Sequence, residues 1–370
     1  RTEEPASQTF TLTGQTSARE FALYDNGPPF YYVDANASGA ETGDSFADAF
    51  TDLQDALAIA KPGEIIVVAG GTYKPGSDRT DAFRIDGSQD GLTVAGGFEG
   101  TESFESVSAF EASLPARDFA ANETILSGNL GIPGLSNDDA YHVLFIDGIT
   151  SGPITNATTL NGLTITAGNA DGSEANASGA GLYCNGGGPG NACAPTIRAT
   201  QFVDNTATSD GGALYNNGSN GGSSSPRIID TVFANNTAVR GGAVSNIGSD
   251  GTSSPELINT VFADNTADRG GAIYNDASDG TSSPTLANAT LTGNTAAFGG
   301  AVYSSASGSG TSVPDIVNTI LWDNTATDTG NDVYSTNGAV PVVRYTLVED
   351  GCPADADCGD GSTLRTEDPL

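Results

Sequence analysis

Residues 226–245 read PRIIDTVFANNTAVRGGAVS, and residues 255–274 read PELINTVFADNTADRGGAIY. The second stretch repeats the Pro, Phe, Asn and Gly-Gly-Ala positions of the first after 29 residues. Five prolines mark the repeat at spacings of 31, 29, 29 and 30 residues: Pro195, Pro226, Pro255, Pro284 and Pro314. Apolar residues within a unit form short runs without a helical period, which predicts strands. Three short strands and three turns per unit predict one coil of a parallel β-helix, whose coils stack at roughly 4.8 Å.

The repeat predicts two columns of stacked side chains inside the solenoid. An apolar residue seven places after each proline stacks on its equivalents, and each contributes about 1.5–3 kcal/mol by burial. This core stack is Phe202, Phe233, Phe262, Leu291 and Leu321. The Asn three residues later can form a ladder, because its amide can bond the coils above and below. This structural ladder is Asn205, Asn236, Asn265, Asn294 and Asn324.

A Gly-Gly-Ala segment closes most units at a tight corner, where glycine permits positive φ or close backbone approach. After one aliphatic residue, Tyr usually follows, as at Tyr215, Tyr274 and Tyr303. Ser245 stands in the gap of this column. The polar replacement favours a column that faces outward.

The chain divides into an extension, a solenoid and a tail. The β-helix is expected to span residues 31–350, with its clearest repeats at 195–334. Residues 45–60 place apolar side chains on one helical face and stop at Lys61-Pro62-Gly63, which predicts a helix that caps the open N-terminal end. Residues 1–30 lack the repeat but contain one alternating strand around Phe10 and Leu12, and residues 351–370 are a polar tail.

Composition indicates an exported protein. The net charge of −33, with only 13 basic residues, argues against binding to nucleic acid or anionic membranes. No run of 18 apolar residues is present, so no membrane insertion is expected in this chain. The chain begins with Arg and contains no Met, which suggests that a signal peptide has been removed. The cysteines are predicted to form two short disulfide loops, Cys184–Cys193 and Cys352–Cys358, as expected outside the cell.

Few residues indicate chemistry, and no catalytic residue is assigned. Asp250 and Asp279 occupy the same place in a loop that occurs twice, Ser-Asp-Gly-Thr-Ser-Ser-Pro. They are interpreted as solvated turn residues, with a weak calcium site as the alternative, so no cofactor is required and calcium alone is considered. Arg240 and Arg269 are the best stacked basic pair and are interpreted as members of surface ion pairs. The acidic residues expected nearest to them are Asp210 and Asp268.

The pairing of Gly-Gly-Ala-Val at 241–244 with Phe-Ala-Asn-Asn at 233–236 resembles the repeats of chlamydial polymorphic outer-membrane proteins. Many bacterial secreted right-handed parallel β-helix proteins carry similar repeats. Residues 32–36, 52–57 and 69–73 resemble the opening of pectin-lyase-like solenoids. The resemblance implies an all-β, right-handed, single-stranded parallel β-helix. It implies surface display and adhesion in some members and polysaccharide cleavage in others.

We expect a non-enzymatic extracellular or cell-surface protein with a structural or adhesive role. Its partners are expected to be further copies of the chain, or a surface glycan or protein. The lone N-terminal strand can add to the edge of another subunit, and stacked solenoid ends need not close, so fibres can form. The same strand can instead fold back on its own solenoid. The alternative function is a polysaccharide lyase or glycoside hydrolase, although the net charge of −33 would repel an acidic polysaccharide at low ionic strength.

Overall fold

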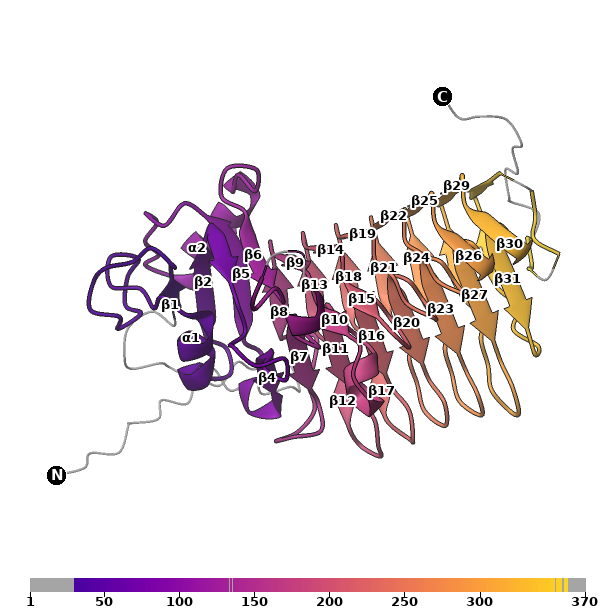
Figure 1. The fold of residues 1–370 in the computed structure, drawn as a ribbon, viewed down its shortest axis with the longest axis horizontal. Helices are drawn as coiled ribbons and strands as arrows, with labels where there is room; N and C mark the ends of the chain where they lie inside the picture. Colours follow the sequence, from indigo (N-terminus) through magenta and orange to yellow (C-terminus); the bar gives the residue numbers. More distant parts are fainter. Residues whose placement is uncertain (1–29, 133, 135, 350, 355, 359–370) are drawn as a thin grey trace, which may run out of the picture.

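The computed structural model describes residues 30–132, 134, 136–349, 351–354 and 356–358. These residues form a parallel β-helix whose coils follow one another along the long axis, from the N-terminal end to the C-terminal end (Figure 1). The predicted all-β solenoid is therefore confirmed. The predicted assembly strand with Phe10 and Leu12 lies outside the described residues.

Three long parallel sheets, here called A, B and C, form the walls of the solenoid. Sheet A contains β1 (Phe30–Val33), β2 (Ile65–Ala69), β5 (Thr93–Phe98), β8 (Thr159–Asn161), β13 (Thr196–Arg198), β18 (Arg227–Ile229), β21 (Glu256–Ile258), β24 (Thr285–Ala287), β28 (Asp315–Val317) and β32 (Val342–Arg344). Sheet B contains β3 (Gly71–Tyr73), β6 (Thr124–Ser127), β9 (Thr164–Thr166), β14 (Gln201–Val203), β19 (Val232–Ala234), β22 (Val261–Ala263), β25 (Thr290–Thr292), β29 (Ile320–Trp322) and β33 (Leu347–Val348). Sheet C contains β4 (Phe83–Asp86), β7 (Leu144–Asp147), β11 (Leu182–Asn185), β16 (Leu214–Asn217), β20 (Val244–Ile247), β23 (Ile273–Asp276), β27 (Val302–Ser305) and β31 (Val333–Thr336).

Three two-stranded parallel ladders join turns of neighbouring coils. They are β10 (Asn169–Ala170) with β15 (Thr206–Ala207), β12 (Ala192–Cys193) with β17 (Ser223–Ser224), and β26 (Thr295–Phe298) with β30 (Thr325–Thr329). The α-helices of the described chain are short, namely α1 (Leu53–Ile59) and α2 (Val107–Ser113). Within the described residues, no helix is long and apolar enough to cross a membrane.

The helix predicted over residues 45–60 is wrong in its first half, because only α1 is helical. Asp52 caps the N-terminus of α1, since its side chain accepts a hydrogen bond from the backbone of Gln54. Phe50 pairs instead with β1, where its N–H donates to the carbonyl oxygen of Tyr32 over 3.0 Å. Leu53 and Leu57 of α1 are buried in the core. That α1 caps the solenoid stays a prediction.

The two predicted columns occupy the interior. The ring centroids of Phe202 and Phe233 are 5.0 Å apart, and those of Phe233 and Phe262 are 4.8 Å apart. Leu291 and Leu321 continue the register on β25 and β29, and all five side chains are fully buried. Beside them, amide nitrogens of the ladder donate to the next amide oxygen over 2.9–3.1 Å, from Asn205 through Asn236, Asn265 and Asn294 to Asn324.

Both predicted disulfides are confirmed. Cys184 and Cys193 join β11 to β12, with their Cα atoms 5.7 Å apart. Cys352 and Cys358 close the segment after β33, with their Cα atoms 6.1 Å apart. Asp357 in this second loop forms a parallel bridge with Val342, so the loop lies along the C-terminal edge of sheet A.

Candidate binding site

An aromatic column runs along the outer face of sheet C. Leu214 and Asn216 of β16 are fully buried, so Tyr215 between them faces the opposite side of the strand. The register of sheet C aligns Tyr215 with one equivalent residue on each of the other strands. From β4 to β31 the column reads Arg84, Phe145, Tyr183, Tyr215, Ser245, Tyr274, Tyr303 and Tyr334. Some adjacent rings stack, as in Tyr274 and Tyr303, whose centroids are 5.3 Å apart, whereas Tyr303 and Tyr334 are tilted. Although the column points away from the solenoid interior, Tyr274 and Tyr303 are themselves buried.

A second row lies beside this column, in the turn that leads into sheet C. Parallel bridges align four residues of successive coils, namely Asp210, Arg240, Arg269 and Phe298. Arg240 forms an ion pair with Asp210, and the Arg240 Nη2 atom lies 2.6 Å from Asp210 Oδ2. Its guanidinium carbon is also 5.5 Å from the ring centroid of Tyr274. The guanidinium carbon of Arg269 is 5.8 Å from the ring centroid of Tyr303, so both cations lie within range of an aromatic face.

The two arginines differ in how their charge is compensated. Burial lowers the pKa of Arg240, but the charges of Asp210 and Tyr274 outweigh this effect, so that its pKa is raised overall. Arg269 is exposed and makes no ion pair with any other described residue. The predicted ion pair is therefore present for Arg240, although its partner Asp210 is buried, and no ion pair is found for Arg269 among the described residues. The guanidinium of Arg269 is exposed beside the ring of Tyr303.

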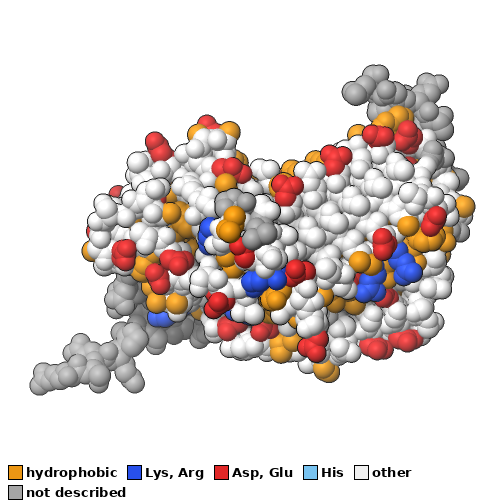
Figure 2. Space-filling view, in the orientation of Figure 1, with side chains coloured by type: hydrophobic (Ala, Val, Ile, Leu, Met, Phe, Trp, Pro, Cys, Tyr) orange, Lys and Arg blue, Asp and Glu red, His pale blue; other side chains and the backbone are white. Residues whose placement is uncertain are grey.

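A hollow of about 470 Å³ opens over this row. Its lining residues are Val239, Arg240, Asp268, Arg269, Ala297 and Phe298. Val239 is 42% exposed, which places an apolar group beside the guanidinium groups. In Figure 2, basic side chains lie among hydrophobic ones in a band along this face, and acidic side chains lie both within the band and along its edges. The hollow can therefore hold a ligand that combines an apolar face with hydrogen-bond acceptors.

The predicted calcium residues lie in a different part of the coil. Asp250 and Asp279 occupy equivalent turns, with φ values of 54° and 56°. The Asp279 carboxylate accepts hydrogen bonds from the backbone N–H and the hydroxyl of Ser309 over 2.8 and 3.2 Å. It therefore fixes the turn of the next coil. Among the residues with described positions, no group of three or more His, Cys, Asp or Glu side chains is arranged to hold a metal ion.

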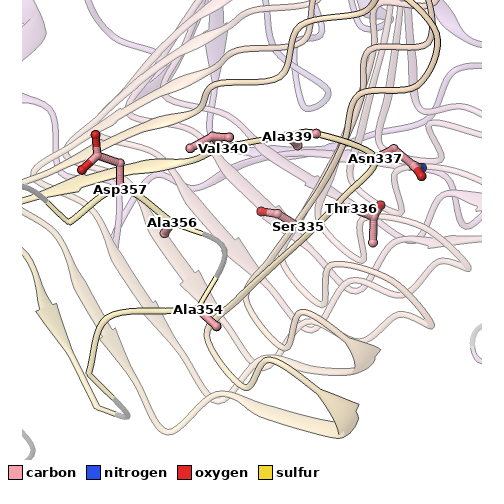
Figure 3. A pocket seen from close by; sticks show the side chains of 9 residues that line it. Ser335, Thr336, Asn337, Ala339, Val340, Ala354, Ala356 and Asp357 are labelled. Carbon is pink, nitrogen blue, oxygen red and sulfur yellow. The ribbon is translucent and has the colours of Figure 1, made fainter.

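A second hollow lies at the C-terminal end of the solenoid. It has a volume of about 460 Å³ and lies between residues 335–340 and the disulfide loop (Figure 3). Its lining is mostly small side chains, and Asp357 is the acidic residue within it. This chemistry offers little to bind a charged ligand, and we regard the arginine hollow as the candidate site.

Sequence reasoning missed two features of sheet C. A second amide ladder lies on its inner face, where Asn216 Nδ2 donates to Asn246 Oδ1 over 2.8 Å and Asn246 donates to Asn275 over 2.9 Å. The recurrence of Asn after the Tyr column could have indicated it. Phe298 was also missed as a member of the second row. It occupies the position that Arg240 and Arg269 occupy in the two preceding coils, and the change from Arg to Phe conceals this equivalence in the sequence.

Comparison with known proteins supports the fold and the repeat. The Chlamydia polymorphic membrane protein repeat matches residues 199–217 and 259–276. Among solved structures, the pectate lyase Pel9A is similar, with a TM-score of 0.50 and 15% identity over 91% of this chain and 80% of that chain. The chain has a pectin-lyase-like β-helix fold. A rhamnogalacturonan lyase shares 12% identity at a TM-score of 0.36, over 86% of this chain and 68% of that one. No curated protein gives a significant match.

The pectin-lyase-like β-helix therefore carries repeats of the kind found in chlamydial polymorphic membrane proteins, as the sequence motifs suggested. The matched residues include parts of the core stack, the asparagine ladder and the Gly-Gly-Ala corner. The likeness to the lyase shows the fold alone, because fold and reaction are separable.

Proposed function

We propose that this β-helix is a non-enzymatic, surface-displayed protein that binds a surface glycan through the outer face of sheet C. The observation that carries the proposal is the row of Arg240, Arg269 and Phe298 beside the aromatic column. A guanidinium offers several donors in a fixed plane, and an aromatic ring offers a rigid apolar surface. A sugar presents oxygen acceptors at its rim and an apolar face, so it matches both groups. The match to the chlamydial repeat supports display at a surface.

Binding of the purified chain to immobilised surface glycans tests this proposal. Arg269→Ala removes the guanidinium that no other described residue pairs with, and we expect it to weaken binding at least tenfold. Arg227→Ala is the matched control, because Arg227 is also exposed but pairs with Glu256 on sheet A. We expect this control to bind like the wild type. Wild-type protein that binds no surface glycan, or equal loss in both variants, would contradict the proposal.

The alternative function is polysaccharide cleavage, the reaction of the pectate lyase whose fold this chain shares. A lyase needs a base that removes a proton next to a carboxylate, and its product is an unsaturated sugar that absorbs ultraviolet light. We expect no such product from polygalacturonate, with or without calcium. Turnover that disappears in Arg269→Ala would replace the adhesive function with a lyase at the same site.

A further inference from the structure

The connection from β6 to β7 closes on itself next to the wall of the solenoid. The backbone N–H of Ala140 donates to the carbonyl oxygen of Gly128 over 2.8 Å, which brings the two ends of the connection together. Within the connection, Asn129 directly follows Gly128 and Asp139 directly precedes Ala140. The backbone N–H of Ile132 donates to Asp138 Oδ2 over 3.0 Å and folds the connection back toward the same end.

Three side-chain oxygen atoms of this connection are buried and have no hydrogen-bond partner among the described residues. They are Oδ1 of Asn129, Oδ1 of Asp138 and Oδ1 of Asp139. All three are acceptors, so they cannot satisfy one another. Asp139 is only 8% exposed, and its burial together with the charge of Asp138 raises its pKa to about 6. Buried acceptors without donors are rare in folded proteins, and a group of them indicates a missing ligand or water.

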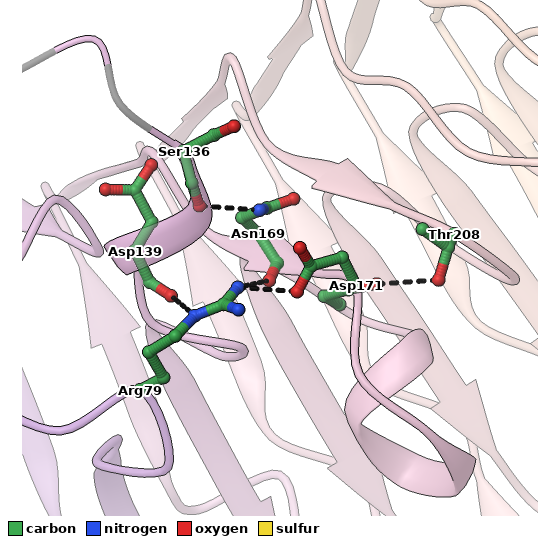
Figure 4. Close-up of polar contacts among 7 residues, drawn as sticks. Arg79, Ser136, Asp139, Asn169, Asp171 and Thr208 are labelled. Atoms are coloured by element: carbon green, nitrogen blue, oxygen red, sulfur yellow. Dashed lines mark hydrogen bonds and ion pairs between the residues drawn. The ribbon is translucent and has the colours of Figure 1, made fainter.

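The basic residues closest to this group are engaged elsewhere. Arg79 Nε donates to the main-chain oxygen of Asp139 over 2.7 Å, and its Nη2 donates to the main-chain oxygen of Asn169 and to Asp171. Figure 4 shows the Asp139 carboxylate directed away from this guanidinium. Lys74 Nζ donates to the carbonyl oxygen of Leu130 over 3.4 Å. The nearby cationic side chains therefore do not supply donors to the three buried oxygens.

We propose that Asn129, Asp138 and Asp139 bind a calcium ion through these side-chain oxygens. Two carboxylates and an amide oxygen are hard ligands, and calcium accepts six to eight such oxygens in flexible geometry, with carbonyl groups and water as the remainder. This set has two carboxylates and one amide. It therefore differs from a metal site made of three or more His, Cys, Asp or Glu side chains, which is not found among the described residues. The ion would fix the β6–β7 connection against the solenoid wall.

The proposal is tested by removing bound metal with EDTA, removing the EDTA, and titrating the protein with calcium in an isothermal titration calorimeter. We expect one ion per chain. Asp139→Asn keeps the shape of the side chain while it removes the charge, so it should weaken calcium binding at least tenfold, and Asp138→Asn should do the same. The double variant Asp250→Asn/Asp279→Asn is the matched control, because it removes two exposed carboxylates that the repeat had suggested as a calcium site. This control should bind calcium like the wild type.

Each other outcome overturns the assignment. If wild-type protein binds no calcium at millimolar concentration, the three oxygens are satisfied by buried water or by a proton. If binding survives in Asp139→Asn but is lost in the control variant, the ion binds at the coil turns instead. Should Asp139→Asn fail to fold in EDTA by circular dichroism, Asn129→Ala provides the same comparison, since it removes a neutral ligand and leaves both carboxylates in place.

Discussion

The amide of Asn265 shows how a single residue holds three coils together. Its Nδ2 donates to the carbonyl oxygen of Phe233 over 3.0 Å and to Asn294 Oδ1 over 2.9 Å. Its Oδ1 accepts from the backbone N–H and the Nδ2 of Asn236, both over 3.0 Å. The side chain is fully buried, so each of these bonds replaces water that cannot reach the turn. The turn backbone would otherwise carry unpaired polar groups inside the solenoid.

Replacing Asn265 by Ala should therefore be strongly destabilising. Buried groups that lose their partner cost about 1–3 kcal/mol each, and we expect the free energy of unfolding to fall by about 3–5 kcal/mol. Thr266→Ala is the control, because the neighbouring Thr266 is exposed, and it should change the value by less than about 0.5 kcal/mol. Urea denaturation followed by circular dichroism measures both. Equal effects of the two substitutions would show that the ladder contributes nothing specific.

His142 is a buried base whose pKa makes stability depend on pH. Its Nδ1 lies 3.0 Å from the carbonyl oxygen of Gly179, and its ring packs against Phe145 and Tyr183. Burial lowers its pKa below the ordinary value of 6.5, and the charge of Arg84 acts in the same direction. The unfolded chain consequently takes up a proton at a higher pH than the folded chain. The stabilising contribution of neutral His142 is complete above pH 6.5 and is lost as the pH falls toward the lower folded-state pKa.

This sign gives a test that compares His142→Asn with the wild type. The variant should be less stable at neutral pH, because it loses ring contacts. The difference in unfolding free energy should then shrink as the pH falls from about 7.5 to 5.5. The raised pKa of Asp139 has the opposite effect on stability but is common to both proteins, so it cancels. A difference that stays constant over this range, measured in EDTA, would contradict the lowered pKa of His142.

The asparagines also show what a residue pattern can and cannot predict. An Asn recurs at the same turn of the five repeated coils, three residues after the core stack, as at Asn265. An amide repeated at a turn in this way is typical of a ladder that bonds successive coils. Asn246 lies within a strand, where alternation alone does not decide whether Asn or the aromatic column faces inward. An aromatic side chain would ordinarily be placed in the core. Ser245 in the column hinted at the outward direction, but only the structure shows that Asn246 points into the solenoid and that Tyr274, although buried, lies on the opposite face of sheet C.

At the scale of elements, the strands were more predictable than the helix. The repeat fixes the strands because every coil presents the same residues to the same neighbours. The segment around Phe50 lacks that repetition, and its apolar spacing suits a helix equally well. Both backbone groups of Phe50 bond to the chain at β1 instead. Its N–H donates to Tyr32, and its carbonyl oxygen accepts from the N–H of Asp34, just after β1, over 2.9 Å. Such long-range hydrogen bonds override local propensity and cannot be predicted from a single occurrence.

The core stack predicts how one strand tolerates substitution. Phe233 on β19 packs between Phe202 and Phe262, and the same column carries Leu291 and Leu321 in later coils. Phe233→Ala should cost about 3–5 kcal/mol of unfolding free energy, because it leaves a cavity between rigid rings. Phe233→Leu should cost only about 1 kcal/mol, since the column already accepts Leu. Urea denaturation that gives equal losses for both variants would show that ring stacking, rather than volume, sets the cost.

At the scale of the whole molecule, the two ends of the solenoid differ from its sides. Along the sides, each strand pairs with a neighbour in the next coil. The terminal strands of the three sheets are β1, β3 and β4 at one end and β31, β32 and β33 at the other. At the first end, the backbone of Phe50 pairs with part of β1. The disulfide loop lies along β32, where Asp357 N–H donates to Pro341 and Val343 N–H donates to Asp357, both over 2.8 Å. Unpaired strand edges are the parts of such a molecule that can pair with another chain.

This arrangement makes the N-terminal extension decisive for self-association. We propose that the alternating segment with Phe10 and Leu12 adds to a strand edge of another copy, which would produce filaments because head-to-tail contacts need not close. Deletion of residues 1–29 leaves β1 intact and should abolish oligomers in sedimentation velocity and filaments in electron microscopy. Phe10→Asp/Leu12→Asp should have the same effect at full length, since charged residues resist burial in a new sheet. If filaments persist unchanged in both, strand exchange is wrong. If the wild type is monomeric at all concentrations, the strand does not act between chains.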